Sequence, residues 1–208
     1  MYWTTRFLLG LTFLISSGAL VRAESSAAPS ELGRPLFRYF TARDYHGDSS
    51  INAATQDNQG RMFFGNQDCV LEFDGQTWNT IPVNGAAFIR GLQCDANGTI
   101  WVGGVNQVGK LVFANGGFSF KSFGSIPGAH LETGPVWQAF SFGKTYFFTD
   151  QGLYTPAGDH LELTPWPIQS DNFWRISTVG DRLFAHAQGK PLFELVGSGF
   201  REVAPADN

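Results

Sequence analysis

The stretch from Ile51 to Val83, which reads INAATQDNQGRMFFGNQDCVLEFDGQTWNTIPV, decides the fold. Its apolar and aromatic segments are separated by polar turns. Asp57 to Gly60 and Asp74-Gly75 are turn signals, because Asp caps a tight turn and Gly accepts a positive φ. Pro82 cannot donate to a strand ladder, so it suits an outer strand. The stretch therefore predicts one four-stranded antiparallel sheet, with strands at 51–56, 61–65, 70–73 and 77–83.

The same pattern recurs along the rest of the chain. Residues 89–123 read IRGLQCDANGTIWVGGVNQVGKLVFANGGFSFKSF, with Asp95 to Gly98 in the place of Asp57 to Gly60. Two weaker copies follow, and the spacing is roughly 40 residues, the length of a β-propeller blade. The predicted fold class is all-β, with four four-stranded blades of a β-propeller. The blades are expected at about 51–83, 89–123, 136–166 and 173–205.

Composition excludes several other classes of protein. The 208 residues are 15% aromatic and 15% charged, whereas disordered chains are poor in aromatics and rich in charge. The formal net charge is −4 and no basic block occurs, so we expect no nucleic-acid partner. Glycine, β-branched and aromatic residues dominate over strong helix formers, which disfavours a helical bundle.

The N-terminal residues have the order of a secretory signal peptide. Arg6 precedes an apolar stretch from Phe7 to Leu20, and Val21-Arg22-Ala23 offers small residues at a cleavage site. The apolar run has about 14 residues, whereas spanning a membrane needs about 20. We therefore expect a signal peptide at 1–23, a flexible Ser/Ala/Pro-rich leader at 24–34, and a periplasmic or otherwise exported product. No membrane span is expected after cleavage.

Several strings resemble a known repeat family. INAATQDNQGRMFFGN, VLEFDGQTW and IWVGG look like two-component regulator propeller repeats, and PVWQAF and KTYFFTDQGLY are similar to blades of the same group. These repeats build the exported sensor region of bacterial hybrid histidine kinases and related regulators. The resemblance covers about residues 35–205 and implies an exported, sensor-type, ligand-binding propeller. In the family a triple-tyrosine β-sandwich, a membrane helix and an output domain follow; the resemblance here covers the N-terminal portion only.

The two ends of the repeat region suggest an incomplete propeller within residues 35–208. Residues 36–41 resemble an outer strand but precede the first full repeat, so we expect an extra, unpaired strand there. The last blade is expected to expose Leu192, Phe193, Leu195 and Phe200, and the first to expose Ile51, Phe63 and Phe64. Such open apolar faces predict self-association or dependence on missing downstream blades.

Catalytic constellations are weak in this sequence. Asp57, Asp74 and Asp95 occupy turn positions that backbone capping explains, and the four histidines have no metal-ligand spacing. Cys69 and Cys94 fall at opposite ends of strands and thus about 16 Å apart, beyond the roughly 7 Å that a disulfide tolerates. We expect free thiols, no metal, no cofactor and no catalytic residue.

The repeat pattern indicates a candidate binding surface more clearly than a catalytic site. In each first strand the fourth residue is apolar and is expected to pack between blades, whereas the second residue is polar or a large aromatic. The apolar set is Ala54, Leu92, Ala139 and Ile176. The predicted ligand-binding set comprises these second residues and the loop residues near them: Asn52, Arg90, Trp137, Trp174, Asn66, Asn106, Asp150 and His186. An Arg suits acidic groups and Trp faces suit sugar rings, although both Trp side chains are as readily explained as core.

The sequence is compatible with three functions. The first is an exported sensor-type propeller that binds an oligosaccharide or another small polar ligand without catalysing a reaction. The second is a propeller hydrolase or lyase acting on glycans, which converging carboxylates or a metal would favour. The third is a protein-interaction scaffold, which an apolar, dry channel would favour.

Overall fold

A computed structural model describes residues 37–105, 107–123, 136–158 and 160–205. The expected signal peptide at 1–23 and leader at 24–34 lie outside the described residues. The chain divides into two compact units, residues 1–38 and 39–208, and every described element belongs to the second unit. Within the described ranges, no helix has the length and apolar character needed to cross a membrane.

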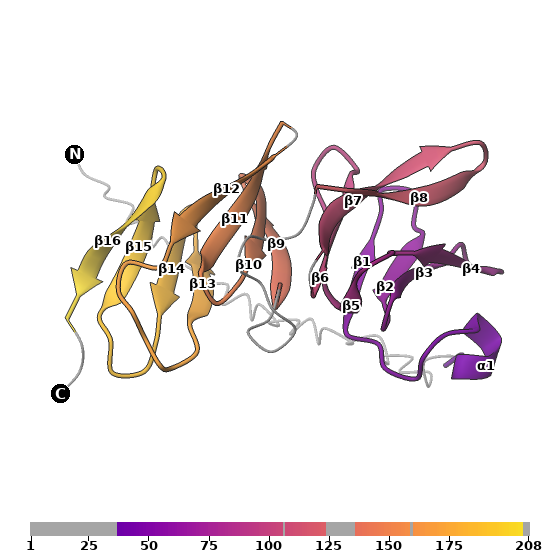
Figure 1. Ribbon diagram of the computed structural model, residues 1–208, viewed down its shortest axis with the longest axis horizontal. Helices are drawn as coiled ribbons and strands as arrows, with labels where there is room; N and C mark the ends of the chain where they lie inside the picture. Colours follow the sequence, from indigo (N-terminus) through magenta and orange to yellow (C-terminus); the bar gives the residue numbers. More distant parts are fainter. Residues whose placement is uncertain (1–36, 106, 124–135, 159, 206–208) are drawn as a thin grey trace, which may run out of the picture. The chain divides into compact units, whose positions relative to one another are not determined.

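The described residues of unit 39–208 form one short helix and four four-stranded sheets (Figure 1). In each sheet the strands are antiparallel and follow one another in chain order. This confirms the all-β class and the four blades. The helix is α1 (Ala42–Tyr45), and the strands of blade 1 are β1 (Ala53–Gln56), β2 (Met62–Gly65), β3 (Cys69–Phe73) and β4 (Trp78–Pro82). Blade 2 comprises β5 (Ala87–Cys94), β6 (Ile100–Val105), β7 (Gln107–Ala114) and β8 (Gly117–Ser122).

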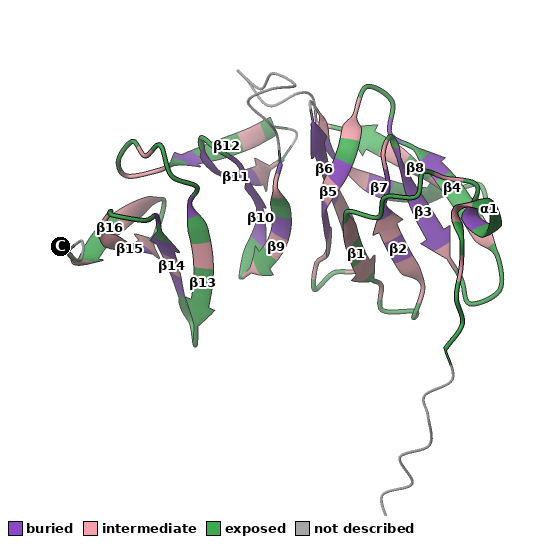
Figure 2. Cartoon of the chain, turned by 90° about the horizontal axis from the view of Figure 1, so that it is seen from below, coloured by how far each residue is buried: buried purple, intermediate pink, exposed green. Residues whose placement is uncertain are grey.

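The other two sheets follow the same plan. Blade 3 comprises β9 (Gln138–Phe142), β10 (Lys144–Phe148), β11 (Gly152–Ala157) and β12 (His160–Pro165). Blade 4 comprises β13 (Arg175–Val179), β14 (Arg182–His186), β15 (Leu192–Val196) and β16 (Gly199–Ala204). Figure 2 shows many buried residues in the inner strands of the sheets, whereas β13 and β16 contain only exposed and intermediate residues.

The turn carboxylates cap the backbone, as the sequence predicts. Asp74 accepts hydrogen bonds from the backbone N–H groups of Thr77 at 2.7 Å and Gln76 at 2.8 Å, and from the Thr77 hydroxyl at 2.7 Å. These donors, the Thr77 N–H above all, lower the pKa of Asp74 to about 2. Gly75 adopts φ +101°, a conformation that a side chain would strain. Asp74 is thus engaged by its own turn.

Neighbouring blades pack through apolar faces. Phe63 of blade 1 is fully buried in one cluster with Leu92 and Val102 of blade 2. Blades 2 and 3 approach so closely that a Cβ added at Gly103 would lie 2.6 Å from Val136 Cγ1. Between blades 3 and 4, one cluster joins Leu153 and Phe148 to Leu183 and Phe193 of the last sheet. Trp174, which immediately precedes that sheet, belongs to the same cluster.

Most of the residues predicted to pack between blades do so. Leu92 and Ala139 are buried, and Ile176 packs against the cluster between blades 3 and 4. Ala54 is exposed, so the prediction is wrong at that position. Its strand, β1, alternates between intermediate and exposed residues, and Ala54 lies on the exposed side.

The extra strand predicted at 36–41 is wrong for the described residues of that segment. Residues 37–41 are not in a strand, and they lead directly into α1. The hydroxyl of Thr41 donates to Asp44 at 2.7 Å, which closes the first turn of this helix. We call residues Phe40–Tyr45 the N-terminal cap, because their apolar side chains pack on the side of blade 1 that carries Phe64, Leu71 and Trp78.

The cap is held by aromatic contacts, and the chain that follows it is held by one buried amide. The Phe40 ring lies 5.0 Å from that of Phe73 and 5.2 Å from that of Trp78, centroid to centroid. Asn66, only 1% exposed, accepts from the Asp48 N–H at 2.9 Å through Oδ1. Its Nδ2 donates to the carbonyl oxygens of Asp48 at 2.7 Å and Ser50 at 3.0 Å. Asn66 therefore fixes the chain between the cap and β1.

The cap and the packing between blades bury most of the apolar side chains that were expected to be exposed on the first and last blades. Phe63 is 0% and Phe193 5% exposed, and Phe64 packs under the cap, so the prediction that they are exposed is wrong. Leu195 and Phe200 are partly buried against the cluster between blades 3 and 4, and Leu192 is likewise only partly exposed. Ile51, at 43% exposure, is exposed as predicted.

The opposite face of blade 4 carries an ionic network. Side chains alternate along β15, so Glu194 lies on the face opposite to Phe193. Its carboxylate accepts from Arg182 Nε at 2.7 Å and Nη2 at 2.9 Å, and from Arg201 Nη2 at 2.9 Å. Hydrogen bonds from Arg182 and then Arg201 lower the pKa of Glu194 to about 2. This face of the last blade is therefore polar at its centre.

Both cysteines are free thiols, which confirms the prediction. Cys69 is buried, and this burial raises the pKa of its thiol to about 11. Cys94 is partly exposed, and its pKa is also raised, chiefly by burial.

Candidate ligand-binding groove

Three of the predicted ligand-binding residues meet at the junction of blades 2 and 3. The guanidinium carbon of Arg90, on β5, lies 4.7 Å from the centroid of the Trp137 ring. Trp137 Nε1 in turn donates to Asp150 Oδ1 at 2.7 Å. Asp150 is exposed and follows β10, whereas Trp137 immediately precedes β9. Arg90 and Trp137, predicted from the second position of each first strand, therefore lie together with the predicted loop residue Asp150.

A fourth member of this cluster, Phe88, was missed by sequence reasoning. Phe88 has φ +51°, which is unusual for a bulky residue. The pairing of β5 with β6 is irregular at this point, because Ala87 pairs with Val105 and the next pair is Gly91 with Gly103. The Phe88 ring remains 37% exposed and lies 5.4 Å from the Arg90 guanidinium carbon. The sequence Ala-Ala-Phe-Ile reads as ordinary strand, so only the backbone reveals this bulge.

Next to Asp150, the segment joining blades 3 and 4 forms two adjoining pockets of about 530 and 290 Å³. Asp150, Ser170 and Trp174 line both, so we treat the two together as the aromatic groove. The larger pocket is also lined by Gln151, Pro165, Trp166, Pro167, Ile168 and Gln169. The smaller is also lined by Phe148, Thr149, Asp171, Asn172 and Phe173.

Aromatic rings organise this groove. Trp166 stacks on Trp174 with ring centroids 5.0 Å apart, and Trp166 Nε1 donates to the Thr149 carbonyl oxygen at 3.1 Å. Phe173 is 52% exposed and meets the Trp137 ring edge to face at 5.5 Å. Phe173 therefore connects the groove to the Arg90 and Trp137 stack.

Polar groups are placed around these rings. Ser170 accepts from the Asn172 N–H at 3.1 Å, and Asn172 Nδ2 donates to the Gln188 carbonyl oxygen at 3.1 Å. The two carboxylates of the smaller pocket are Asp150 and Asp171. Sequence reasoning missed Asp171, because the segment that carries it has no repeat signal. The groove thus combines aromatic faces with carboxylate, amide and hydroxyl groups.

The structure gives the other predicted residues different roles. Trp174 lines the groove but is only 5% exposed, so it belongs mainly to the core between blades 3 and 4. Asn66 is buried and its amide is occupied by Asp48 and Ser50, so its assignment as a ligand-binding rim residue is wrong. Asn52 and His186 are exposed but line neither pocket. Asn106 lies outside the described residues.

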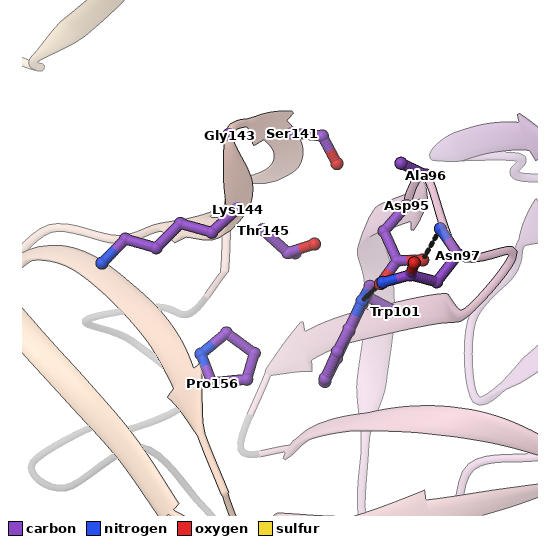
Figure 3. A pocket seen from close by; sticks show the side chains of 9 residues that line it. All are labelled: Asp95, Ala96, Asn97, Trp101, Ser141, Gly143, Lys144, Thr145 and Pro156. Carbon is purple, nitrogen blue, oxygen red and sulfur yellow. Dashed lines mark hydrogen bonds between the residues drawn. The ribbon is translucent and has the colours of Figure 1, made fainter.

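A third pocket, of about 350 Å³, lies between the β5–β6 turn and the β9–β10 hairpin (Figure 3). Asp95 and Trp101 line it from blade 2, and Ser141, Lys144 and Thr145 line it from blade 3. Asp95 is engaged by its own turn and by Trp101 Nε1 at 2.8 Å, and the Lys144 side chain extends away from Asp95. This pocket brings together none of the predicted residues.

The described residues contain no group of three or more His, Cys, Asp or Glu side chains able to hold a metal ion. In the groove itself, the available chemistry is stacking on aromatic faces and hydrogen bonding to hydroxyl groups.

Comparisons with known proteins give a partial likeness to a solved structure. No family model and no curated protein matches the chain. A solved structure, the extracellular domain of a one-component system from B. thetaiotaomicron, matches 82% of this chain with 15% identity and a TM-score of 0.41. The chain spans 29% of the length of that solved chain, so the likeness is to part of a larger extracellular domain.

Proposed function

We propose that this protein is an exported, sensor-type propeller module that binds an oligosaccharide in the aromatic groove. One observation carries the proposal: Trp166 and Phe173 bring aromatic rings to the same groove as Asp150, Ser170 and Asn172. Sugar rings present apolar C–H faces that pack on aromatic rings, and hydroxyl groups that pair with carboxylates and amides. The larger pocket, of about 530 Å³, falls in the range of small-molecule sites.

Two features of the sequence support the sensor role. The N-terminal signal-peptide pattern supports export, and the blade motifs resemble two-component regulator propellers. In this proposal the chain recognises the ligand and does not transform it.

Titration calorimetry of the purified protein against neutral and acidic oligosaccharides tests the binding role. The Phe173→Ala variant removes an exposed ring from the groove and is expected to weaken binding about tenfold, or about 1.4 kcal/mol. Phe113→Ala is the matched control, because Phe113 is 57% exposed and lies on β7, outside the groove. Absence of binding to every oligosaccharide, or equal effects of the two variants, would contradict the proposal.

A glycan-degrading enzyme is a second candidate, favoured by Asp150 and Asp171 in one pocket. Glycosidases use two carboxylates on either side of the scissile bond. Prolonged incubation of the protein with the oligosaccharides that bind it, followed by chromatography of the products, separates the two functions. New, shorter products that disappear with Asp171→Asn would establish the enzyme and refute the binding module.

A further inference from the structure

The bulge at Phe88 holds Arg90 in an unusual setting. Backbone strain of this kind persists only where the surrounding structure enforces it, and bulges re-aim side chains beside functional sites. Here the bulge leaves Phe88 and Trp137 with their rings close to the Arg90 guanidinium, at 5.4 and 4.7 Å. Arg90 is therefore positioned by two aromatic rings from two different blades.

Arg90 is also a cation without an acidic partner in the part of the chain that the structure describes. The salt bridges there involve Arg61, His160, Arg182 and Arg201, and none involves Arg90. Stacking engages the faces of a guanidinium and leaves its in-plane N–H donors available. Arg90 is partly exposed.

The position of Arg90 relates this cation to the groove. Trp137 contacts Arg90, and it also contacts Asp150 and Phe173, both of which line the groove. A ligand longer than one sugar ring can therefore lie in the groove and extend past Trp137 to Arg90. The planar fork of an Arg matches a carboxylate, which accepts two parallel hydrogen bonds.

We propose that Arg90 binds a carboxylate of the ligand, so that the oligosaccharide is an acidic one containing uronic acid units. This inference rests on the proposed oligosaccharide-binding function and names the ligand class for the same site. Asp150 and Asp171 would disfavour an anion within the groove, so the carboxylate lies at the Arg90 end. The sugar ring next to it packs in the aromatic groove.

The test compares trigalacturonate with its methyl ester, which has the same rings and no charge, and with a sulfated trisaccharide. We expect calorimetry to show at least tenfold tighter binding of the free acid than of the ester. Arg90→Gln is expected to abolish this preference while the ester still binds. Arg90→Lys keeps the charge but loses the fork, so it is expected to retain part of the preference. Arg43→Gln, an exposed arginine on α1, is the control and is expected to change nothing.

The outcomes separate the two proposals. Equal binding of acid and ester by the unmodified protein, tighter binding of the sulfated sugar, or a preference that survives Arg90→Gln would overturn the assignment of Arg90 alone. Failure of all three sugars and of neutral oligosaccharides to bind would overturn the proposed function as well.

Discussion

Replacing Asn66 by Ala removes the amide that fixes the chain between the cap and β1. The side chain makes three hydrogen bonds to backbone groups, one with the Asp48 N–H and two with the carbonyl oxygens of Asp48 and Ser50. A buried hydrogen bond contributes about 1 kcal/mol net, so their loss is expected to lower the free energy of unfolding by about 3 kcal/mol. The cap is expected to loosen as well, since only His46 and Gly47 separate Asp48 from it.

Urea denaturation followed by tryptophan fluorescence measures the free energy, and amide hydrogen exchange at Asp48 measures the local effect. Asn52→Ala is the matched control, because Asn52 is exposed. Among the described contacts its only hydrogen bond is the one that its backbone N–H donates to the Gly65 carbonyl oxygen, and the substitution leaves this bond in place. It is expected to change the free energy by less than about 0.5 kcal/mol. A loss below about 1 kcal/mol in Asn66→Ala, with unchanged exchange at Asp48, would refute the structural role assigned to Asn66.

Two further predictions concern the blade interfaces and blade 4. Gly103→Ala places a Cβ against Val136 Cγ1 and is expected to lower the free energy of unfolding in urea by about 1–3 kcal/mol. Gly117→Ala is the control and is expected to be nearly neutral, because no atom lies within 4 Å of the added Cβ. Equal stability of the two variants would contradict the close packing of blades 2 and 3. The folded-state pKa of Glu194, about 2, lies below its ordinary value of 4.5, so its stabilising contribution is complete above that value and is lost as the pH falls towards 2. Thermal unfolding between pH 5 and pH 2.5 should therefore show a smaller fall in melting temperature for Glu194→Gln than for the unmodified protein, and parallel pH profiles would show that the network with Arg182 and Arg201 does not form.

Local sequence signals were sufficient for the blades. Asp74-Gly75 and Asp57 to Gly60 specify their turns through side-chain and backbone hydrogen bonds between near neighbours, and such contacts can be derived from sequence spacing. The free thiols followed from strand geometry in the same way. Leu92, Ala139 and Ile176, predicted to pack between blades, follow from the same repeat, because each holds the same position in its own blade.

Contacts between distant segments could not be derived in this way. Phe40 is compatible with an outer strand as well as with a cap. Its role as a cap residue follows only from its contact with Trp78 on the face of blade 1. Asn66 stands in a run of polar residues that is typical of an exposed loop. Its burial depends on contacts with Asp48 and Ser50, which come from an earlier segment of the chain. The groove and the neighbouring Arg90–Trp137 cluster were predicted in part, because Arg90, Trp137 and Asp150 follow the repeat, whereas Phe88 and Asp171 lie in irregular backbone.

The position of the cap has a consequence for the order of folding. Each sheet pairs strands that are adjacent in sequence, a topology of local contacts that favours rapid folding. An N-terminal strand that paired with the last blade would have to wait for the whole chain, with its apolar side chains exposed to aggregation meanwhile. The cap instead docks on β3 and β4, the second half of the first sheet to be synthesised. One apolar face of blade 1 can therefore be protected by the cap while the later blades are still emerging, and its other face, which carries Phe63, is covered once blade 2 has formed.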